Sequence, residues 1–405
     1  MFALPHATLG AALALGLVSA ALPGAAARAE TLTQLVDAAS RRMPELAAIQ
    51  ARRVAAAARH AAAGSITPGP PVLGGRYITD QVIRNRNARE LEVSISTPLW
   101  LPGEGTASQH AAAAEIARLA AQEAALRLKV AGLVREAAAA VALARSDLQT
   151  GEQRLRDARL LEGDVARRVK ARELAETDLL TAQADRIAAE AELHERRGAL
   201  GQARIGLAGI TGIKVGDVVL NEPEPSAAPT LDPRLEEART ALDVARANLD
   251  LVTTQSRENP EVGLVGRRSR DMNGVQWNNS LGVELRIPLG GTARNAPRQG
   301  AARAEMADAV ATHGNQQRDI ETDRRRARSV YDTAIAQRGL ARDRAAVLVR
   351  QRDLTERSFR QGQAALPDLI RVRALAVEAG GASSRAAIAV LLARGRLNQA
   401  LGVMP

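Results

Sequence analysis

The sequence contains no cysteine and very few aromatic residues. The first absence excludes disulfides, thiolate chemistry and a lipid-modified N-terminal cysteine. Aromatic residues make up 1% of the 405 residues, too few for the core of a large globular domain. The hydrophobic 46% is mostly alanine, leucine and valine, so burial has to come from close contacts between helices. Lysine is also rare, and the net charge of +10 therefore rests on arginine.

Groupings of catalytic or metal-binding residues are also missing. The five histidines are scattered without ligand spacing, and no Ser/His/Asp arrangement or phosphate-binding glycine loop is present. The sequence therefore predicts no enzyme, no metal site and no cofactor. Arginine clusters such as residues 324–326 are interleaved with acidic residues and lack aromatic partners. This pattern disfavours nucleic acid as a partner and favours charge pairs on helix surfaces.

Residues 1–29 are predicted to be a cleaved secretory signal peptide. An apolar segment at 9–22 is followed by Ala27-Arg28-Ala29, a small-x-small cleavage site before Glu30. The alternative, an N-terminal membrane anchor, requires a longer apolar span with charged flanks. Beyond the signal, the sequence shows no apolar run of transmembrane-helix length. An exported protein of this kind is predicted to be periplasmic, secreted or an outer-membrane barrel.

The mature chain contains an internal repeat, in which the second copy follows the first at an offset of 190 residues. Residues 281–289 alternate between apolar and polar side chains, which predicts a strand with one apolar face, and residues 91–99 repeat the pattern (281 − 91 = 190). Other positions at structural breaks repeat as well: Pro70 with Pro260, Asp178 with Asp368, and Gly212 with Gly402. A repeat of this length indicates a duplicated half-molecule rather than a solenoid.

Each half is predicted to contain a helix, a β-hairpin and a long helical hairpin. The first repeat covers 30–212, and the second, 232–405, follows a proline-rich linker at 213–231. In the first repeat, a helix broken at Met43-Pro44 precedes a hairpin at 71–99 and a helical hairpin at 103–212. In the second, the corresponding segments are 233–256, 261–289 and 291–402.

The long helices are predicted to be rods with a coiled-coil seam. Leucines at 119, 126 and 133 are seven residues apart, and a second sevenfold series, 134, 141, 148 and 155, continues one residue out of phase. A helix over 104–172 would be roughly 100 Å long. Such a rod has to lie against other rods.

The four strands predict self-assembly. Strands of nine or ten residues with one apolar face fit a membrane barrel, but four strands cannot close, and an open edge in lipid leaves backbone groups unpaired. Two chains would supply eight strands, and three would supply twelve and leave a lumen. The alternative is a soluble sheet. The residues predicted to face lipid are Leu91, Val93, Ile95, Leu281, Val283 and Leu285.

Aromatic residues gather at the hairpins, as they do at membrane interfaces. Tyr77, Trp100 and Trp277 lie in or beside the predicted strands, whereas only Tyr331 and Phe359 lie elsewhere in the mature chain. We interpret the three hairpin residues as an aromatic belt.

The motifs and their order resemble the TolC-like outer-membrane factor family. They are Arg-x-Gly-x(5)-Asp-Leu-Ile at 360–370, Glu-Thr-Asp-Leu-Leu-x-Ala at 176–182, and Leu-x(4)-Gly at 207–212 and 397–402. The short chain is most similar to the cation-efflux, CzcC-like branch. The resemblance implies a homotrimer with a twelve-strand outer-membrane β-barrel above a twelve-helix periplasmic α-barrel. Its implied partners are outer-membrane lipid, a periplasmic adaptor (membrane fusion protein) and an inner-membrane pump, often of the resistance-nodulation-division (RND) type.

The turns of the helical hairpins are the candidate periplasmic aperture. The resemblance implies that acidic rings near these tips, here Asp178 and Asp368, narrow the mouth and favour cations. A structural interpretation is that both are helix-start carboxylates. Two residues depart from the family pattern: Arg371 stands where a second acid is expected, and Arg172 stands where the other repeat has Gly362. We expect Thr177 to cap the return helix.

Three functions remain open from the sequence. The first is a passive outer-membrane efflux duct for metal cations or drugs, with a role in metal resistance as one possibility. The second is an outer-membrane duct for type I protein secretion. The third is a periplasmic coiled-coil adaptor or scaffold, although no lipoyl-like β domain is recognisable. The sequence does not distinguish metal ion, drug and protein as cargo.

Overall fold

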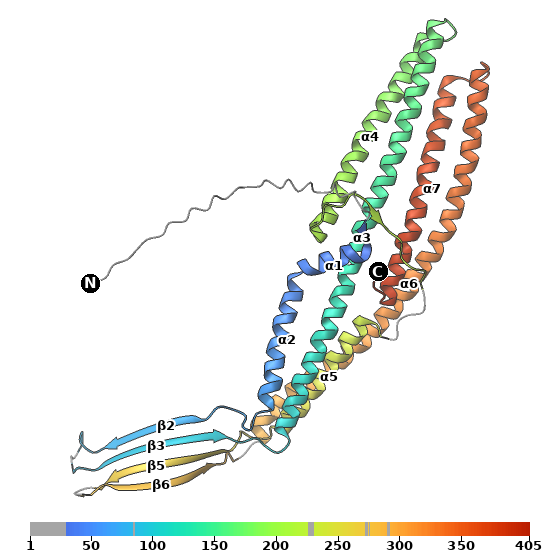
Figure 1. Ribbon diagram of the computed structural model, residues 1–405. Coiled ribbons are helices and arrows are strands. Elements are labelled where there is room, and N and C mark those ends of the chain that lie inside the picture. The colour runs from blue at the N-terminus through green and yellow to red at the C-terminus, as the bar shows by residue number, and fades with distance from the viewer. Residues whose placement is uncertain (1–29, 84–85, 226–230, 272–273, 275, 290–291) are drawn as a thin grey trace, which may run out of the picture.

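A computed structural model describes residues 30–83, 86–225, 231–271, 274, 276–289 and 292–405. The predicted signal peptide, 1–29, lies outside the described residues. The protein is mainly helical and elongated, with two helical hairpin tips at one end and a small β-sheet at the other (Figure 1).

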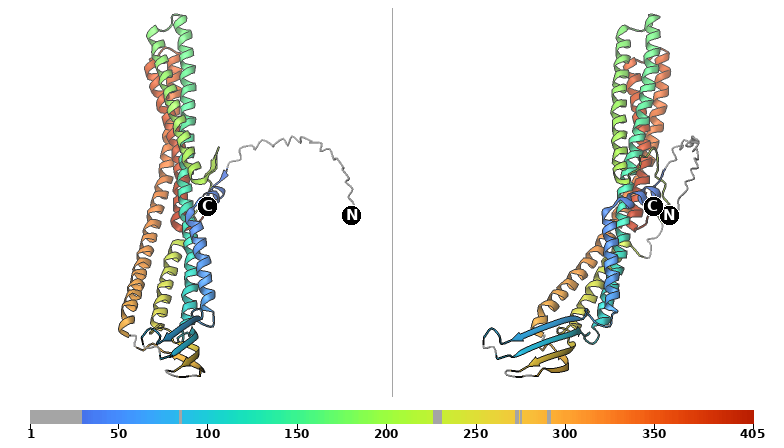
Figure 2. Two further views of the ribbon diagram at one scale, coloured as in Figure 1. Left: turned by 90° about the vertical axis from the view of Figure 1, so that its left-hand side faces the viewer. Right: turned by 60° about the vertical axis from the view of Figure 1, so that its left-hand side comes forward.

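Two helices run most of the length of the molecule: α3 (Glu104–Lys170, 67 residues) and α6 (Thr292–Arg360, 69 residues). At 1.5 Å per residue each spans roughly 100 Å. Shorter helices flank them, α2 and α5 near the sheet and α4 and α7 towards the tips (Figures 1 and 2). The bounds of these shorter helices are α1 Leu32–Arg42, α2 Pro44–Ala63, α4 Glu176–Thr211, α5 Pro233–Thr254 and α7 Leu366–Leu401.

Prolines, glycines and caps set the ends of these helices. Met43 is both the C-cap of α1 and the N-cap of α2, and Pro44 follows at the first helical position, where its missing N–H is not needed. Thr31 forms a capping box with Gln34 at the start of α1. Gly212 and Gly402 end α4 and α7 in the left-handed conformation, with φ of 75° and 84°.

The four long strands form one antiparallel sheet in the order β2-β3-β5-β6. Their bounds are β2 Val72–Thr79, β3 Arg89–Pro98, β5 Glu261–Arg270 and β6 Asn278–Arg286. The two hairpins are joined through β3 and β5, with Val93 opposite Gly266. Strand β6 ends at Arg286, earlier than the predicted 289, because its pairing with β5 ends at Glu261 and Pro288 has no N–H to donate.

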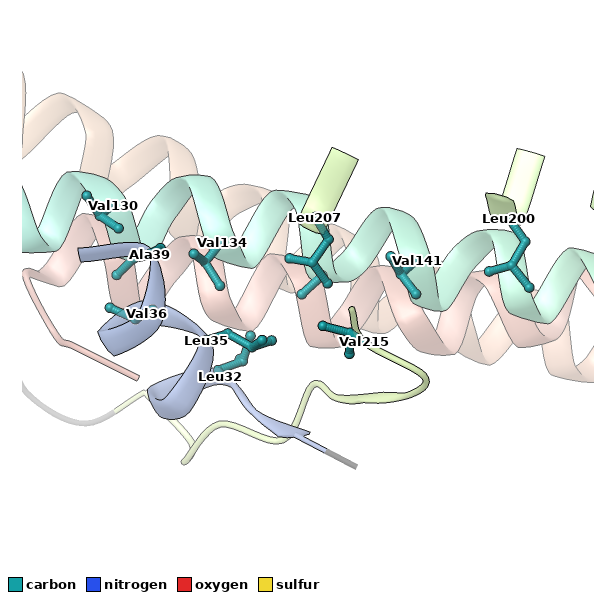
Figure 3. Packing of buried hydrophobic residues seen from close by; sticks show 12 residues of the cluster. Leu32, Leu35, Val36, Ala39, Val130, Val134, Val141, Leu200, Leu207 and Val215 are labelled. Atoms are coloured by element: carbon teal, nitrogen blue, oxygen red, sulfur yellow. The ribbon is translucent and has the colours of Figure 1, made fainter. Parts of the chain in front are cut away.

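A hydrophobic cluster at mid-length holds the start of the mature chain against the rods. In it, α1 lies across α3 and inserts its apolar face between α3 and the end of α4 (Figure 3). The two-residue strands β1 (Glu30–Thr31) and β4 (Val218–Val219) pair in parallel beside it. The members labelled in Figure 3 are Leu32, Leu35, Val36, Ala39, Val130, Val134, Val141, Leu200, Leu207 and Val215.

The buried face of α3 shifts by one residue between Leu133 and Val134. Leu119 is fully buried, Leu133 is 45% exposed, and Val134 beside it is fully buried. The change occurs where α1 and the end of α4 reach α3, so the helix presents a new face to new neighbours.

The sequence did not predict that helix α7 is long and apolar. By length and composition, α7 could cross a membrane, which contradicts the expectation that no such run follows the signal. The window is apolar because small residues fill it, and only Glu378 and Arg385 interrupt residues 374–393. Helix α7 packs along α6 and α3, and its buried face includes Ala376, Gly381 and Ala393. Within one chain, 22% of the apolar window is buried, so contacts between these helices account for only part of its apolar surface.

Candidate functional site: hairpin tips, sheet and mid-length charges

Both helical hairpins turn through the same backbone motif. After α6, the Gly362 N–H donates to the Phe359 carbonyl (3.0 Å) and the Gln363 N–H to the Ser358 carbonyl (2.9 Å). After α3, the N–H groups of Arg172 and Glu173 make the equivalent bonds, of 2.9 and 2.8 Å. This is the Schellman motif, which requires a left-handed residue after the helix. Gly362 fills that place with φ 75° and Arg172 with φ 61°.

An Arg172→Gly protein is expected to be more stable at this tip by about 1 kcal/mol, because a left-handed conformation strains every residue with a Cβ. Gly362→Arg transfers the strain to the other repeat and should lower stability by a similar amount. Limited proteolysis at the tips, with thermal unfolding beside it, measures both. If Arg172→Gly increases cleavage at this tip, the arginine side chain makes contacts that outweigh its strain.

The acidic residues at the tips act locally as helix-start groups. Asp178 accepts a hydrogen bond from the Ala175 N–H (3.3 Å), so it closes the first turn of α4. The prediction that Thr177 caps this helix is wrong: Thr177 lies inside α4, where its carbonyl accepts from the Thr181 hydroxyl. Asp368, in the first turn of α7, forms an exposed ion pair with Arg371 (3.3 Å).

A small hydrophobic cluster joins the two tips within one chain. Phe359 is 4% exposed and packs with residues of α3 and α7, including Val165 and Leu369. The Arg168 guanidinium lies 5.2 Å from its ring centroid. Beside the cluster, a groove of about 490 Å³ separates α3 from α6. Its charged lining residues are Asp157, Asp164, Arg167, Arg352, Glu356, Arg360 and Arg373.

The sheet has one apolar and one charged face. Leu91, Val93 and Ile95 of the inner strand β3 are 45–49% exposed. Leu281, Val283 and Leu285 of β6 are 60–82% exposed on the same face, because the register places Leu264 opposite both Ile95 and Val283. All four carboxylates of these strands lie on the other face: Glu90, Glu92, Glu261 and Glu284.

The three predicted belt residues lie at two levels of the sheet. Tyr77 stands opposite Leu91 near the hairpin turns, and Trp277 lies in the turn before β6. Trp100 follows β3 at the helical end, where its Nε1 donates to the Ser65 carbonyl (2.9 Å). Nine residues of extended chain separate Leu91 from Trp100, roughly 30 Å at 3.4 Å per residue. With the strand tilt of about 40° usual in membrane barrels, this length would span roughly 23 Å of depth, close to the apolar band of about 25 Å.

A buried ion pair at mid-length was missed by the sequence analysis. The Arg135 guanidinium on α3 donates to both oxygens of Glu222 at 2.8 Å, and the two side chains are 3% and 5% exposed. Glu222 also accepts from Asn398 (3.1 Å), and Arg135 donates to the Val403 carbonyl (3.0 Å). A Cβ at position 395 would lie 3.0 Å from a Glu222 oxygen, so Gly395 makes room for the linker.

A second charge cluster lies beside the end of α7. Burial favours the neutral form of Asp232, but hydrogen bonds from Arg234 and Arg324 outweigh it and lower its pKa. Both arginines also donate to the Ala400 carbonyl, at 2.7 and 3.3 Å. The linker and the start of the second repeat are thus bound to the rods by paired charges. Among the described residues, no group of three or more His, Asp and Glu side chains is placed to hold a metal ion.

The chain combines an amphipathic four-stranded sheet with paired helical rods. Residues 225–403 match the family described as Outer membrane efflux protein. This match covers the second repeat. No curated protein matches the chain.

Solved outer-membrane channels share the fold over nearly the whole chain. The outer membrane protein VceC of Vibrio cholerae has a TM-score of 0.71 and 16% identity, with 92% of this chain and 96% of that chain covered. The CmeC outer membrane channel of Campylobacter jejuni has a TM-score of 0.71 and 14% identity (92% and 85% covered). The MtrE outer membrane channel of Neisseria gonorrhoeae has a TM-score of 0.71 and 16% identity, with 92% of this chain and 89% of that chain covered. The family match therefore supports the motif resemblance over the second repeat, and the solved structures show the same fold over 92% of the chain.

Proposed function

We propose that this protein is the outer-membrane channel of a tripartite efflux system, a passive homotrimeric duct. The observation that carries the proposal is the sheet. Its apolar face is exposed, and within the described part of the chain β2 and β6 each have one unpaired edge. Pairing β6 of one copy with β2 of the next closes three copies into twelve strands, which leaves a lumen and no open edge in lipid.

The long helices place the tips far from the membrane. With the sheet in the outer membrane, α3 and α6 extend into the periplasm and carry the two turns towards the inner membrane. The partners are then a periplasmic adaptor and an inner-membrane pump of the RND type, which supplies the energy. The proposed assignment is the cation-efflux, CzcC-like branch, with metal cations or drugs as substrates.

Fractionation and detergent extraction test this function. We expect the mature protein in the outer-membrane fraction, and a trimer by mass measurement in mild detergent. Deletion of the gene should lower the minimal inhibitory concentration of the exported metal or drug, and a plasmid copy should restore it. Recovery of the protein in the soluble periplasm, or as a monomer in mild detergent, would contradict the proposal.

The tip charges are proposed to influence ion passage at the periplasmic mouth. Because Arg371 is paired with Asp368, removal of the acid in Asp368→Ala should shift the channel towards anions, and Arg371→Ala should shift it towards cations. Reversal potentials in planar bilayers measure both shifts. If neither variant changes selectivity, Asp368 and Arg371 only support the first turn of α7.

A further inference from the structure

The six arginines of the sheet divide into two groups with different surroundings. Arg76, Arg267 and Arg286 lie on the charged face, and each is paired with a carboxylate there. Their N–O distances are 2.9 Å to Glu92, 2.9 Å to Glu90 and 3.2 Å to Glu261, respectively. On this face, positive charge is balanced within the chain.

The other three arginines lie on the apolar face. The register places Arg89 opposite Arg270 and places Arg268 opposite Leu91, so all three gather at the end of the sheet near the hairpin turns. No strand residue on this face is acidic, and none of the three arginines is within 4.0 Å of a described carboxylate. Arg270 donates to the Asn87 carbonyl (3.2 Å), and the Arg89 Nε is buried without a hydrogen-bond partner among the described residues.

Trp277 completes the cluster. The guanidinium carbons of Arg268 and Arg270 lie 4.9 and 5.0 Å from its ring centroid, which is cation–π distance. The contacts position two arginine side chains beside the indole at the edge of the apolar band. Arg270 also donates to the Asn87 carbonyl and side-chain oxygens, which leaves its remaining N–H donors and those of Arg268 for a ligand.

Closure of the barrel leaves this cluster uncovered. Arg89 lies on β3, and Arg268 and Arg270 lie on β5, which are the two inner strands, whereas copies would meet at β2 and β6. The occupant therefore has to be something outside the barrel wall. In the proposed orientation the hairpin turns point away from the periplasmic rods, and the cluster lies at the level of the outer leaflet.

We propose that Arg89, Arg268, Arg270 and Trp277 bind the phosphate groups of a phosphorylated glycolipid of the lipid A type. The proposal rests on the function proposed above. Guanidinium groups bind phosphate through paired, charge-assisted hydrogen bonds, and cationic side chains at the edge of lipid need an anionic partner. Three arginines match a diphosphorylated headgroup better than the single charge of a phospholipid. The acyl chains would then lie along Leu91, Val93 and Leu264, while Trp277 sits at the interface.

The fluorescence of Trp277 can report binding at this site. The chain has two tryptophans, so Trp100→Phe leaves Trp277 as the single one. We expect lipid A, added to the purified full-length trimer in a nonionic detergent, to shift and saturate the Trp277 emission. Arg268→Gln/Arg270→Gln in this background should weaken binding by at least about tenfold, because it removes the charge-assisted hydrogen bonds from two guanidinium groups. Native mass spectrometry of the wild-type protein, counting bound lipid A per trimer, gives a second readout that does not require the Trp100 substitution.

Arg267→Gln is the matched control, because it removes the neighbouring charge on the opposite face. It should bind lipid A as the parent does. An equal loss in Arg267→Gln would mean that overall charge, not this cluster, attracts the lipid. The same emission change with phosphatidylcholine would reduce the site to unspecific partitioning, and the same change with inorganic phosphate would make it a free-anion site. A trimer that inserts and conducts but does not respond to lipid A overturns this inference alone, whereas a protein outside the membrane overturns the proposed function.

Discussion

Val93→Arg is expected to prevent stable insertion of the protein into the outer membrane. Val93 lies at the middle of the inner strand β3, 49% exposed on the apolar face. A lipid-facing arginine at the bilayer midplane costs about 2–4 kcal/mol, and a trimer carries three of them. The expected result is loss of the trimer from the outer-membrane fraction, together with accumulation of degraded or aggregated protein. Quantitative immunoblots of fractionated cells measure this.

Ser94→Arg is the control, since it places the same residue one position further along the same strand. Ser94 stands opposite Gly74, which has no side chain, on the charged face that would line the lumen of the proposed barrel. It should insert normally and change only conductance. The inner strand is the better site for this test than Val283 on β6, where a substitution could also disturb pairing between copies. Equal tolerance of Val93→Arg and Ser94→Arg would show that the apolar face does not meet lipid.

The parts of the fold that follow from local pattern could be predicted from the sequence. Alternation in β3, the Met43-Pro44 break and the heptads of α3 each depend on residues within a few positions, so the sequence shows them directly. The turn motifs of the two helical hairpins could be aligned with each other for the same reason, through the offset of 190 residues. The predicted cap, Thr177, lies two positions after the true N-cap, Ala175. The Ala175 N–H donates to the Asp178 carboxylate, so the helix starts before the threonine.

Features that depend on distant residues could not be predicted. Arg135 and Glu222 are 87 residues apart, and the offset of 190 pairs Arg135 with Arg325, whose side chain is 76% exposed in an ion pair with Glu321. The neighbouring Arg324 reaches Asp232 instead. The repeat therefore preserves the helices but not their charge partners. The arginine cluster on the apolar face likewise appears only when the β3–β5 register is known.

Glu222→Gln is expected to destabilise each chain by about 3–5 kcal/mol, because it leaves the Arg135 charge buried without a counterion. Thermal unfolding in detergent, followed by helical circular dichroism, measures the loss. Glu136→Gln is the matched control beside Arg135 on α3: its carboxylate pairs with Arg396 on α7, and the two side chains are 49% and 50% exposed. Such pairs contribute about 0–1 kcal/mol, so this variant should unfold close to the wild type.

The double variant Arg135→Leu/Glu222→Leu separates the charge from the shape of the site. Replacing both members of a buried pair by apolar residues is often neutral, whereas removing one is not. The double variant should therefore be more stable than Glu222→Gln, although Asn398, Gln399 and the Val403 carbonyl each lose a partner. If it is as unstable as the single variant, the pair acts chiefly through those hydrogen bonds to α7. The linker would then be held by the network as a whole rather than by the balance of two charges.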